Sequence, residues 1–458
     1  MAFRASPCGG RKALIGTRTS HDCWGSDVRI GWATPFNVRS AIGKFSKMVC
    51  EELATRGHEV DIIRIESGPE LGLDKIVTYL SVMNASNCDV DEYDALVVNF
   101  GNHVPYHAQL ISLLAQRAPI GVFHDMEMRD FEWGLMDRHG MNFPYLPGVK
   151  QEVAATDYSD MVDPDARPLL ATLAALTCGV IIHGPHYRET IAAFCPGTVD
   201  VVPLCFPDNG TAQTASRPAA NLRVTIFGMI NENKQASRVV EALALIRSRF
   251  GDIELHLAGA AESRIRDALL AQAKKLGLKP PIFHGYVSDP VLQDIIESSH
   301  AICCLRYPVT EGGSASLLTA LFRARPLIIS DVASYSMVPD DLAAKVSYGT
   351  DPADVAEALA TIFSAPEKAN GKAERARKWA GERYSARSYV DAVEPLLLAL
   401  PKREPLTTTA RRLIPAVTSP SHDPIPLAIE AFAKVLDWME ECQGLSEDPI
   451  SRRPEAMP

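Results

Sequence analysis

Short apolar runs alternate with longer amphipathic segments along most of the chain. The runs are VRIGWA, VDIIRI, ALVVNF, IGVF, GVIIH and DVVPL in the first half, and RVTIFG, IELHLAG, IFHGYV, AICCL and PLIIS in the second. Segments between them, such as ASRVVEALALIRSRFG at 236–251, repeat apolar residues at helical spacing. The alternation predicts parallel sheets covered by helices, which is the α/β class.

A polar stretch rich in Gly, Pro and Ser, DNGTAQTASRPAAN, interrupts this alternation after Pro207. We therefore predict two α/β domains, each long enough to bury its own core. The predicted divisions are a disordered tail at 1–27, an N-terminal domain at 28–207, a linker at 208–221, a C-terminal domain at 222–384, a C-terminal helix at 385–400 and an extension at 401–458. Whether the helix at 385–400 crosses back to the N-terminal domain stays open.

Charge and cysteine content narrow the class of protein. The net charge of the 458 residues is -10, which argues against a general nucleic-acid binder because such proteins cluster Lys and Arg. Ten cysteines occur without C-x-x-C spacing, so we expect reduced, buried thiols in a cytoplasmic protein. No uncharged apolar run reaches the roughly 18 residues of a spanning helix.

Several familiar motifs are missing from the sequence. The first strand is not followed by G-x-G-x-x-G, which lowers the prospect of a dinucleotide dehydrogenase, and there is no P-loop. Asp89 and Asp91 form a D-x-D, but they lie in the polar stretch NCDVDEYD and are better interpreted as solvated loop charge. Since His and Cys lack zinc spacing as well, we expect no metal site.

The stretch EGGSASLLTALF at 311–322 places a carboxylate and small residues between a strand and a helix. A helix start offers unpaired N–H groups, and Gly312, Gly313, Ser314 and Ala315 let an anion approach the backbone. Glu311 would repel phosphate but could accept hydrogen bonds from sugar hydroxyls. A small-residue helix start that merely packs against the other domain is the alternative.

A second loop in the same domain has a similar layout. Gly228 ends the strand RVTIFG, and Lys234 lies near the next helix start, where a cation would sit beside another helix dipole. A solvated Lys is the alternative for this loop alone. The two loops together favour a ligand in which a sugar is attached to a diphosphate.

Four segments of the C-terminal domain carry a family resemblance: LRVTIFGMINENKQASRVVEAL, ELHLAG, FHGYVSDPVLQDIIESSHAICCL and EGGSASLLTALFRARPLIISD. Their order resembles that of retaining GT-B glycosyltransferases of the family 4 (group 1) type. The resemblance spans about residues 28–400 and is strongest at 222–350. It implies two Rossmann-like domains facing each other across a cleft, with the nucleotide sugar mainly on the C-terminal domain and the acceptor mainly on the N-terminal one.

The resemblance also implies roles for residues on the donor side. Glu311 matches the first glutamate of the family's E-x7-E motif, whereas Thr319 stands at the second. Of the paired cations after the first strand of the domain only Lys234 is kept, because Met229 replaces the other, and Arg238 is a candidate substitute. The expected donor-binding residues are Gly43, Gly228, Asn231, Lys234, Arg238, Gly312, Gly313, Ser314, Ala315 and Thr319.

In the N-terminal half, FGNHVPYH and IGVFHDMEMRDF resemble a subgroup of the same family. The resemblance places His124 beside the reacting sugar, so the expected catalytic residues are His124, Glu311 and Lys234. On the sugar or acceptor side it suggests Asn102, His107 and Asp125, with Gly101 and His103 as weaker candidates. For each histidine, a purely structural role is the alternative.

The function implied by the resemblance is transfer of a hexose-type sugar from a UDP- or GDP-sugar to an acceptor hydroxyl with retention of configuration. The expected acceptors are glycans, lipid-linked sugars or polysaccharides, and no metal or other cofactor is expected. The expected location is the cytoplasm, and peripheral contact with the inner membrane face stays open. Because of Met229 and Thr319, a non-catalytic nucleotide-sugar-binding or scaffold protein on a degenerate GT-B frame is the alternative, and a sugar-nucleotide epimerase is a third.

Overall fold

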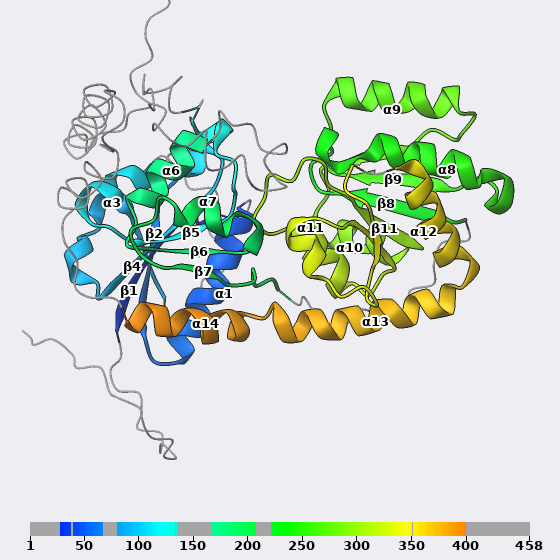
Figure 1. Cartoon of the computed structure of the whole chain (residues 1–458). Helices are drawn as coiled ribbons and strands as arrows, with labels where there is room; N and C mark the ends of the chain where they lie inside the picture. The colour runs from blue at the N-terminus through cyan, green and yellow to red at the C-terminus, as the bar shows by residue number, and fades with distance from the viewer. Residues whose placement is uncertain are drawn as a thin grey trace, which may run out of the picture.

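The computed structural model describes residues 28–37, 40–66, 80–107, 109–132, 134, 167–207, 221–349 and 351–399. The predicted tail at 1–27, the extension at 401–458 and all but the last residue of the predicted linker lie outside the described residues. Two lobes stand side by side, each with a central sheet and helices packed on it (Figure 1).

In the described part of the N-terminal lobe, seven parallel strands pair in the order β3-β2-β1-β4-β5-β6-β7. The strands are β1 (Arg29–Thr34), β2 (Glu59–Arg64), β3 (Ser81–Asn84), β4 (Ala95–Phe100), β5 (Ile120–Phe123), β6 (Gly179–Ile182) and β7 (Val199–Val201). The helices are α1 (Ala41–Thr55), α2 (Val104–His107), α3 (Leu110–Gln116), α6 (Arg167–Ala175) and α7 (Arg188–Ala192). The order reverses between β1 and β4, which is the Rossmann arrangement.

The C-terminal lobe repeats the arrangement with six described strands in the order β10-β9-β8-β11-β12-β13. They are β8 (Arg223–Phe227), β9 (Glu254–Ala258), β10 (Ile282–Gly285), β11 (Ala301–Cys304), β12 (Leu327–Ser330) and β13 (Ala344–Val346). Its helices are α8 (Ala236–Phe250), α9 (Ser263–Lys275), α10 (Asp289–Glu297), α11 (Ala315–Phe322), α12 (Pro352–Ser364) and α13 (Pro366–Arg383). The order reverses between β8 and β11, so the carboxyl ends of these two strands flank a crevice suited to a ligand.

Each strand of the N-terminal sheet sends alternate side chains to opposite faces. Trp32 of β1 and Val97 of β4 belong to the core under α1, whereas Ala33 and Val98, one residue further on, belong to the core on the other face. Both faces are therefore covered, which explains why these strands read as continuous apolar runs in the sequence.

Helix α14 (Ala386–Leu398) belongs to the N-terminal lobe although it follows the C-terminal lobe in the chain (Figure 1). Its apolar face, with Tyr389, Val390, Val393 and Leu397, completes the core that α1 covers. The preceding α13 buries Ala376 and Ala380 in the C-terminal lobe instead. The chain therefore crosses between the lobes at Tyr384, whose carbonyl accepts a hydrogen bond from Phe206 N on the other crossing segment (2.8 Å).

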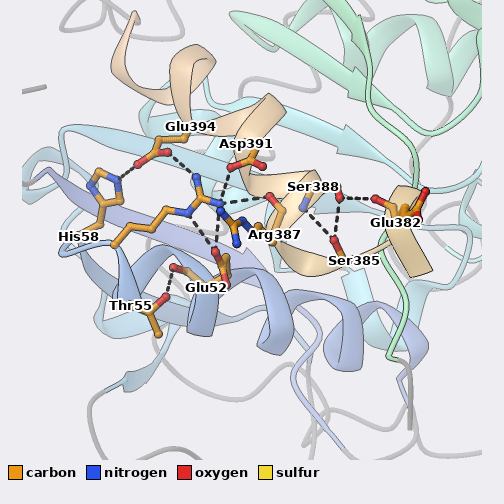
Figure 2. Close-up of polar contacts among 10 residues, drawn as sticks. Glu52, Thr55, His58, Glu382, Ser385, Arg387, Ser388, Asp391 and Glu394 are labelled. Carbon is orange, nitrogen blue, oxygen red and sulfur yellow. Dashed lines mark hydrogen bonds and ion pairs between the residues drawn. The ribbon is translucent and has the colours of Figure 1, made fainter. Parts of the chain in front are cut away.

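The Arg56 guanidinium, just beyond the end of α1, joins α1 to α14 through three carboxylates. Figure 2 labels these carboxylates, Glu52, Asp391 and Glu394. The guanidinium lies 2.7 Å from Asp391, 2.8 Å from Glu394 and 3.0 Å from Glu52. His58 adds a 2.8 Å contact to Glu394. Because Arg56 is only 21% exposed, this cluster is shielded better than an ordinary surface ion pair.

Replacing Arg56 with alanine is expected to lower the free energy of unfolding by about 1–3 kcal/mol, because three carboxylates then crowd together without a counter-charge. Urea unfolding of the purified protein measures this loss. The control is Arg264→Ala, which removes an ion pair to Glu232 whose partners are 75% and 73% exposed, and it should change stability by less than about 1 kcal/mol. Equal effects of the two substitutions would contradict a special role for Arg56.

Among the described residues, no helix combines the length and the apolarity needed to cross a membrane.

Candidate functional site

A cavity of about 920 Å³ lies between the two lobes. Its N-terminal wall includes Lys44 of α1 and the loops after β4 and β5, and its C-terminal wall includes the start of α11 and the loop after β10. At its rim Lys44 Nζ lies 3.1 Å from the Asp289 carboxylate, which joins α1 to α10 across the gap. The cavity thus lies where the carboxyl ends of both parallel sheets face each other.

The loop after β11 connects the lobes through its backbone. Gly312 N donates to His124 O (2.9 Å), and Met126 N donates to Thr310 O (3.1 Å), so Glu311 pairs with Asp125 in a short antiparallel bridge. A Cβ on Gly312 would run into the Tyr187 hydroxyl, which explains the glycine. Glu311 therefore lies at the contact between the lobes.

Within this loop, the Glu311 carboxylate is held by two side chains on one oxygen. Oε1 accepts from Arg306 Nε (2.6 Å) and from the Tyr335 hydroxyl (2.9 Å). Burial alone would raise the pKa of Glu311, but the positive charge of Arg306 and these hydrogen bonds outweigh it, and the pKa lies below its usual value. Glu311 is thus an ionised, oriented carboxylate.

Lys234 lies in the 3₁₀ turn η6 (Glu232–Lys234) between β8 and α8, and it is 5% exposed. Its ammonium donates to Phe227 O (2.6 Å) and to Ser316 Oγ (3.3 Å) at the start of α11. Burial, followed by the nearby charge of Arg306, lowers its pKa to about 7. The lysine side chain and the N-terminal end of α11 therefore converge, as the two loops of the sequence predict.

Gly228 leaves room for the Lys234 ammonium because it has no side chain. Its φ of +87° is in the region that favours glycine, and a Cβ there would lie 2.8 Å from Lys234 Nζ and 3.0 Å from Ser316 Oγ. A side chain at this position would therefore displace the cation.

His124, which follows β5, uses both ring nitrogens inside the protein. Nε2 lies 3.0 Å from Asn99 Oδ1, and Nδ1 lies 3.1 Å from Nε2 of His183, which follows β6. This row of polar contacts ends at Val202 O, next to His183 Nδ1, and at Ala33 O, which accepts from the Asn99 amide. It therefore crosses the carboxyl ends of neighbouring strands. Burial lowers the pKa of His124 and, to about 4, that of His183. His124 contacts the C-terminal lobe through its backbone carbonyl, which accepts a hydrogen bond from Gly312 N.

The predicted acceptor-side residues line the same cavity. Asn102 ties two loops together, because its N–H donates to Asp125 Oδ2 (3.0 Å) and its side-chain oxygen accepts from Phe131 N (2.8 Å). His107 is 2% exposed and bonds His103 O through Nδ1 (2.9 Å), and its Nε2 is buried without a hydrogen-bond partner. Burial raises the pKa of Asp125 to about 7, even though the hydrogen bond from Asn102 opposes the shift. His107 thus keeps an unpaired ring nitrogen, and Asp125 is a carboxyl group that burial makes easier to protonate.

The remaining donor-side predictions divide by position. Gly313, Ala315 and Thr319 line the cavity, and Ser314 caps α11 by accepting from Leu317 N (3.3 Å). The Thr319 hydroxyl donates to Ala315 O (2.8 Å) within its own helix. The other predicted donor-side and catalytic residues of the C-terminal lobe and α1 are not among the residues that line the cavity: Gly43, Gly228, Asn231, Lys234, Arg238, Glu311, Gly312 and Ser314. Gly43 bonds Ser40 Oγ in the first turn of α1, Asn231 has a buried Oδ1 without a partner, and Arg238 pairs with Glu241 on the outer side of α8.

Sequence reasoning missed Arg306, Tyr335, Ser316, His183 and Asn99. His183 directly follows the buried strand β6, and Arg306 comes two residues after the buried strand β11, so a search of every strand end for polar residues would have found both. Tyr335 follows β12 by five positions, and Asn99 lies inside an apolar strand. Neither position carries a recognisable signal.

Comparisons with known proteins agree with this geometry. Residues 221–365 match the family model described as group 1 glycosyl transferases. Among curated proteins, none matches this sequence.

Solved structures of similar fold cover most of the chain. The Anabaena protein HepE, solved with UDP and glucose, has a TM-score of 0.54 at 12% identity and covers 81% of this chain and 100% of its own. Sucrose-phosphate synthase from Thermosynechococcus elongatus has a TM-score of 0.53 at 13% identity, with 85% and 100% covered. WaaG, a glycosyltransferase involved in lipopolysaccharide biosynthesis, has a TM-score of 0.52 at 14% identity, with 80% and 98% covered.

The two parallel-sheet lobes and these similarities confirm the predicted GT-B fold. The family match covers all six described strands of the C-terminal lobe and its helices α8 to α12, and both strand-end loops of the candidate donor site lie within it. This chain therefore has the GT-B architecture of glycosyltransferases, and its C-terminal domain matches group 1 glycosyl transferases.

Proposed function

We propose that this protein is a retaining glycosyltransferase that uses a nucleotide-diphosphate sugar as donor and a hydroxyl group as acceptor. The observation that carries the proposal is the 3.3 Å contact between Lys234 Nζ and Ser316 Oγ, which brings a buried cation to the N-terminal end of α11. A cation and a helix N-terminus together suit a diphosphate. Glu311, whose carboxylate is ionised and oriented, suits the hydroxyls of the sugar attached to it.

In the proposed step, the bond between the anomeric carbon and the distal phosphate oxygen breaks. The acceptor oxygen bonds to the same face of that carbon, the acceptor's proton passes to the departing phosphate oxygen, and a nucleoside diphosphate leaves. Lys234 and the α11 amides stabilise the negative charge that grows on the leaving group. The step assigns this charge to protein groups, so the proposal includes no metal ion or other cofactor.

On the acceptor side, His107 and Asp125 lie at the cavity wall, and His107 Nε2 has no hydrogen-bond partner. We assign the incoming hydroxyl to this side. His124 positions the reacting sugar through the loop that its carbonyl holds. The proposed acceptors are glycans, lipid-linked sugars or polysaccharides, and the proposed location is the cytoplasm, with peripheral contact at the inner membrane face.

A donor screen followed by a transfer assay tests the proposal. UDP-glucose is the first probe, because HepE has also been solved with UDP-glucose, and other UDP- and GDP-sugars follow. The expected result is transfer from one donor, with the configuration of the new glycosidic bond equal to that of the donor by NMR. An inverted product would overturn retention, binding without turnover would favour a nucleotide-sugar-binding protein, and an altered sugar nucleotide without acceptor would favour an epimerase.

The titration of Lys234 gives a prediction on pH. Its pKa in the free protein is about 7, so a growing share of molecules carries a neutral amine above that pH. A bound diphosphate favours the ammonium form, so UDP binding should take up a proton, and affinity should fall by up to about tenfold per pH unit above pH 7. The fall ends where the raised pKa of the complex is reached.

Calorimetry between about pH 7.5 and 9, where the UDP phosphate with its second pKa near 6 is fully ionised, measures this uptake. Repeating each titration in two buffers of different ionisation enthalpy gives the number of protons bound. Lys234→Met keeps the aliphatic stem and should abolish the uptake, whereas Lys275→Ala, an exposed lysine of α9, should leave it unchanged. Uptake that persists in Lys234→Met would show that another group titrates.

A further inference from the structure

Arg306 comes two residues after the end of β11 and is buried at the crevice where the strand order of the C-terminal sheet reverses. Its guanidinium is 7% exposed, donates to Glu311 Oε1 and Leu305 O, and lies 5.6 Å from the centre of the Tyr335 ring. Tyr335 is fully buried and donates to the same Glu311 oxygen. Three side chains from separate positions thus form one hydrogen-bonded unit.

The arrangement leaves the two oxygens of Glu311 unequal. Both described hydrogen bonds fall on Oε1, and the side chain keeps 17% exposure. Oε1 is therefore saturated by the protein, and Oε2 is the oxygen left for a ligand. Since Arg306 Nε approaches to 2.6 Å, it fixes which oxygen that is.

Arg306 also supplies charge that the loop after β8 lacks. Met229 stands there, 70% exposed, and brings no cation. Strands β8 and β11 pair directly, so Lys234 and Arg306 lie beyond the carboxyl ends of neighbouring strands. The Glu311 carboxylate carries the negative charge of the same corner. The two cations and one carboxylate give this buried corner a net charge of +1, which favours an anionic ligand.

We propose that Arg306 is a positioning residue of the donor site, which holds Glu311 as a carboxylate with Oε2 directed to the hydroxyls of the transferred sugar. This inference rests on the proposed function and deepens it. Without Arg306, the effect of burial on the pKa of Glu311 would prevail and favour the protonated form. A protonated carboxyl group is a weaker acceptor for sugar hydroxyls than the carboxylate.

The test compares UDP with UDP-glucose, because the difference between their affinities reports contacts to the sugar alone. Wild type should keep a constant affinity ratio over about pH 5–8. In Arg306→Gln, UDP affinity should fall because the corner loses its net positive charge. The affinity ratio should fall toward one as well, and this fall should start about one pH unit or more higher than in wild type. Arg306→Lys restores the charge without the planar fork and should recover part of the ratio.

Arg117→Gln is the matched control. Arg117 is 6% exposed and donates to the carbonyls of Val90, Tyr93 and Asp94 in the N-terminal lobe, so it reports the general effect of losing a buried arginine. Its affinity ratio should equal that of wild type at every pH. A purely structural role of Arg306 would give the same result in both variants and would overturn the inference.

A second variant keeps the test decisive if Arg306→Gln fails to fold. Tyr335→Phe removes one donor to Oε1 without changing charge, and the ratio should then fall at a higher pH than in wild type, by less than in Arg306→Gln. An unchanged ratio profile in folded Tyr335→Phe would overturn the inference in that case. If wild type binds no nucleotide sugar of the full donor screen, the proposed function itself fails and the inference falls with it.

Discussion

Lys234→Ala is expected to lower the rate of sugar transfer by about 100- to 1,000-fold, which is the usual effect of removing one preorganised donor to a developing negative charge. The ammonium is buried against Phe227 O and Ser316 Oγ, so no solvent-exposed lysine can take its place. The loss should appear mainly in kcat, because the charge on the leaving diphosphate grows as its bond to the sugar breaks.

The variant should still fold. Burial lowers the pKa of Lys234 to about 7, so its ionisation opposes folding at neutral pH, and loss of the charge removes this cost. Circular dichroism and thermal unfolding check this, with Lys275→Ala as the control for losing a lysine. Full turnover in folded Lys234→Ala would remove the cation from the mechanism and with it the main support for a diphosphate site.

Glu311→Gln is expected to reduce transfer by about 100-fold or more while leaving the protein folded. The amide oxygen can still accept from Arg306 and Tyr335, but it lacks the charge that strengthens bonds to sugar hydroxyls. Glu311→Ala should be inactive and less stable by about 3–5 kcal/mol, because it leaves the Arg306 guanidinium buried without its carboxylate. The two substitutions thus separate the charge of Glu311 from its structural contact.

Urea unfolding across pH gives an independent check. A carboxylate whose pKa is lowered in the folded protein adds stability above its unfolded pKa, and that stability is lost as the pH falls through the folded value. The stability gap between wild type and Glu311→Gln should therefore close below about pH 4. Glu262→Gln, at an exposed residue before α9, is the control for losing a carboxylate outside the site.

Most of the sheet could be predicted from the sequence, because buried parallel strands leave continuous apolar runs such as ALVVNF and AICCL. The two strands that escaped prediction, β3 and β13, lie at sheet edges and are short. β3 has only exposed and half-buried side chains, so neither its composition nor its periodicity differs from a loop. Edge strands of this kind are fixed by pairing with a neighbour, which the local sequence does not record.

The candidate site could be predicted where chemistry and chain position coincide. Lys234 and Glu311 stand between a strand and a helix start, and the structure brings both to the crevice beside β8 and β11. The partners of Glu311 could not be assigned, because Tyr335 reaches it from 24 residues away in the sequence. The inward orientation of His124 was equally hidden, because it depends on Asn99 and His183 from two other strands.

The backbone bonds from Gly312 to His124 and from Met126 to Thr310 join the segment that carries Glu311 to the N-terminal lobe. Swinging the lobes apart to admit a donor would break both bonds and release the segment that carries Glu311. The complete site would then form only after the lobes close around the donor. Water that enters the open form would find Glu311 displaced. Such coupling would protect an activated sugar from wasteful hydrolysis until its acceptor is enclosed.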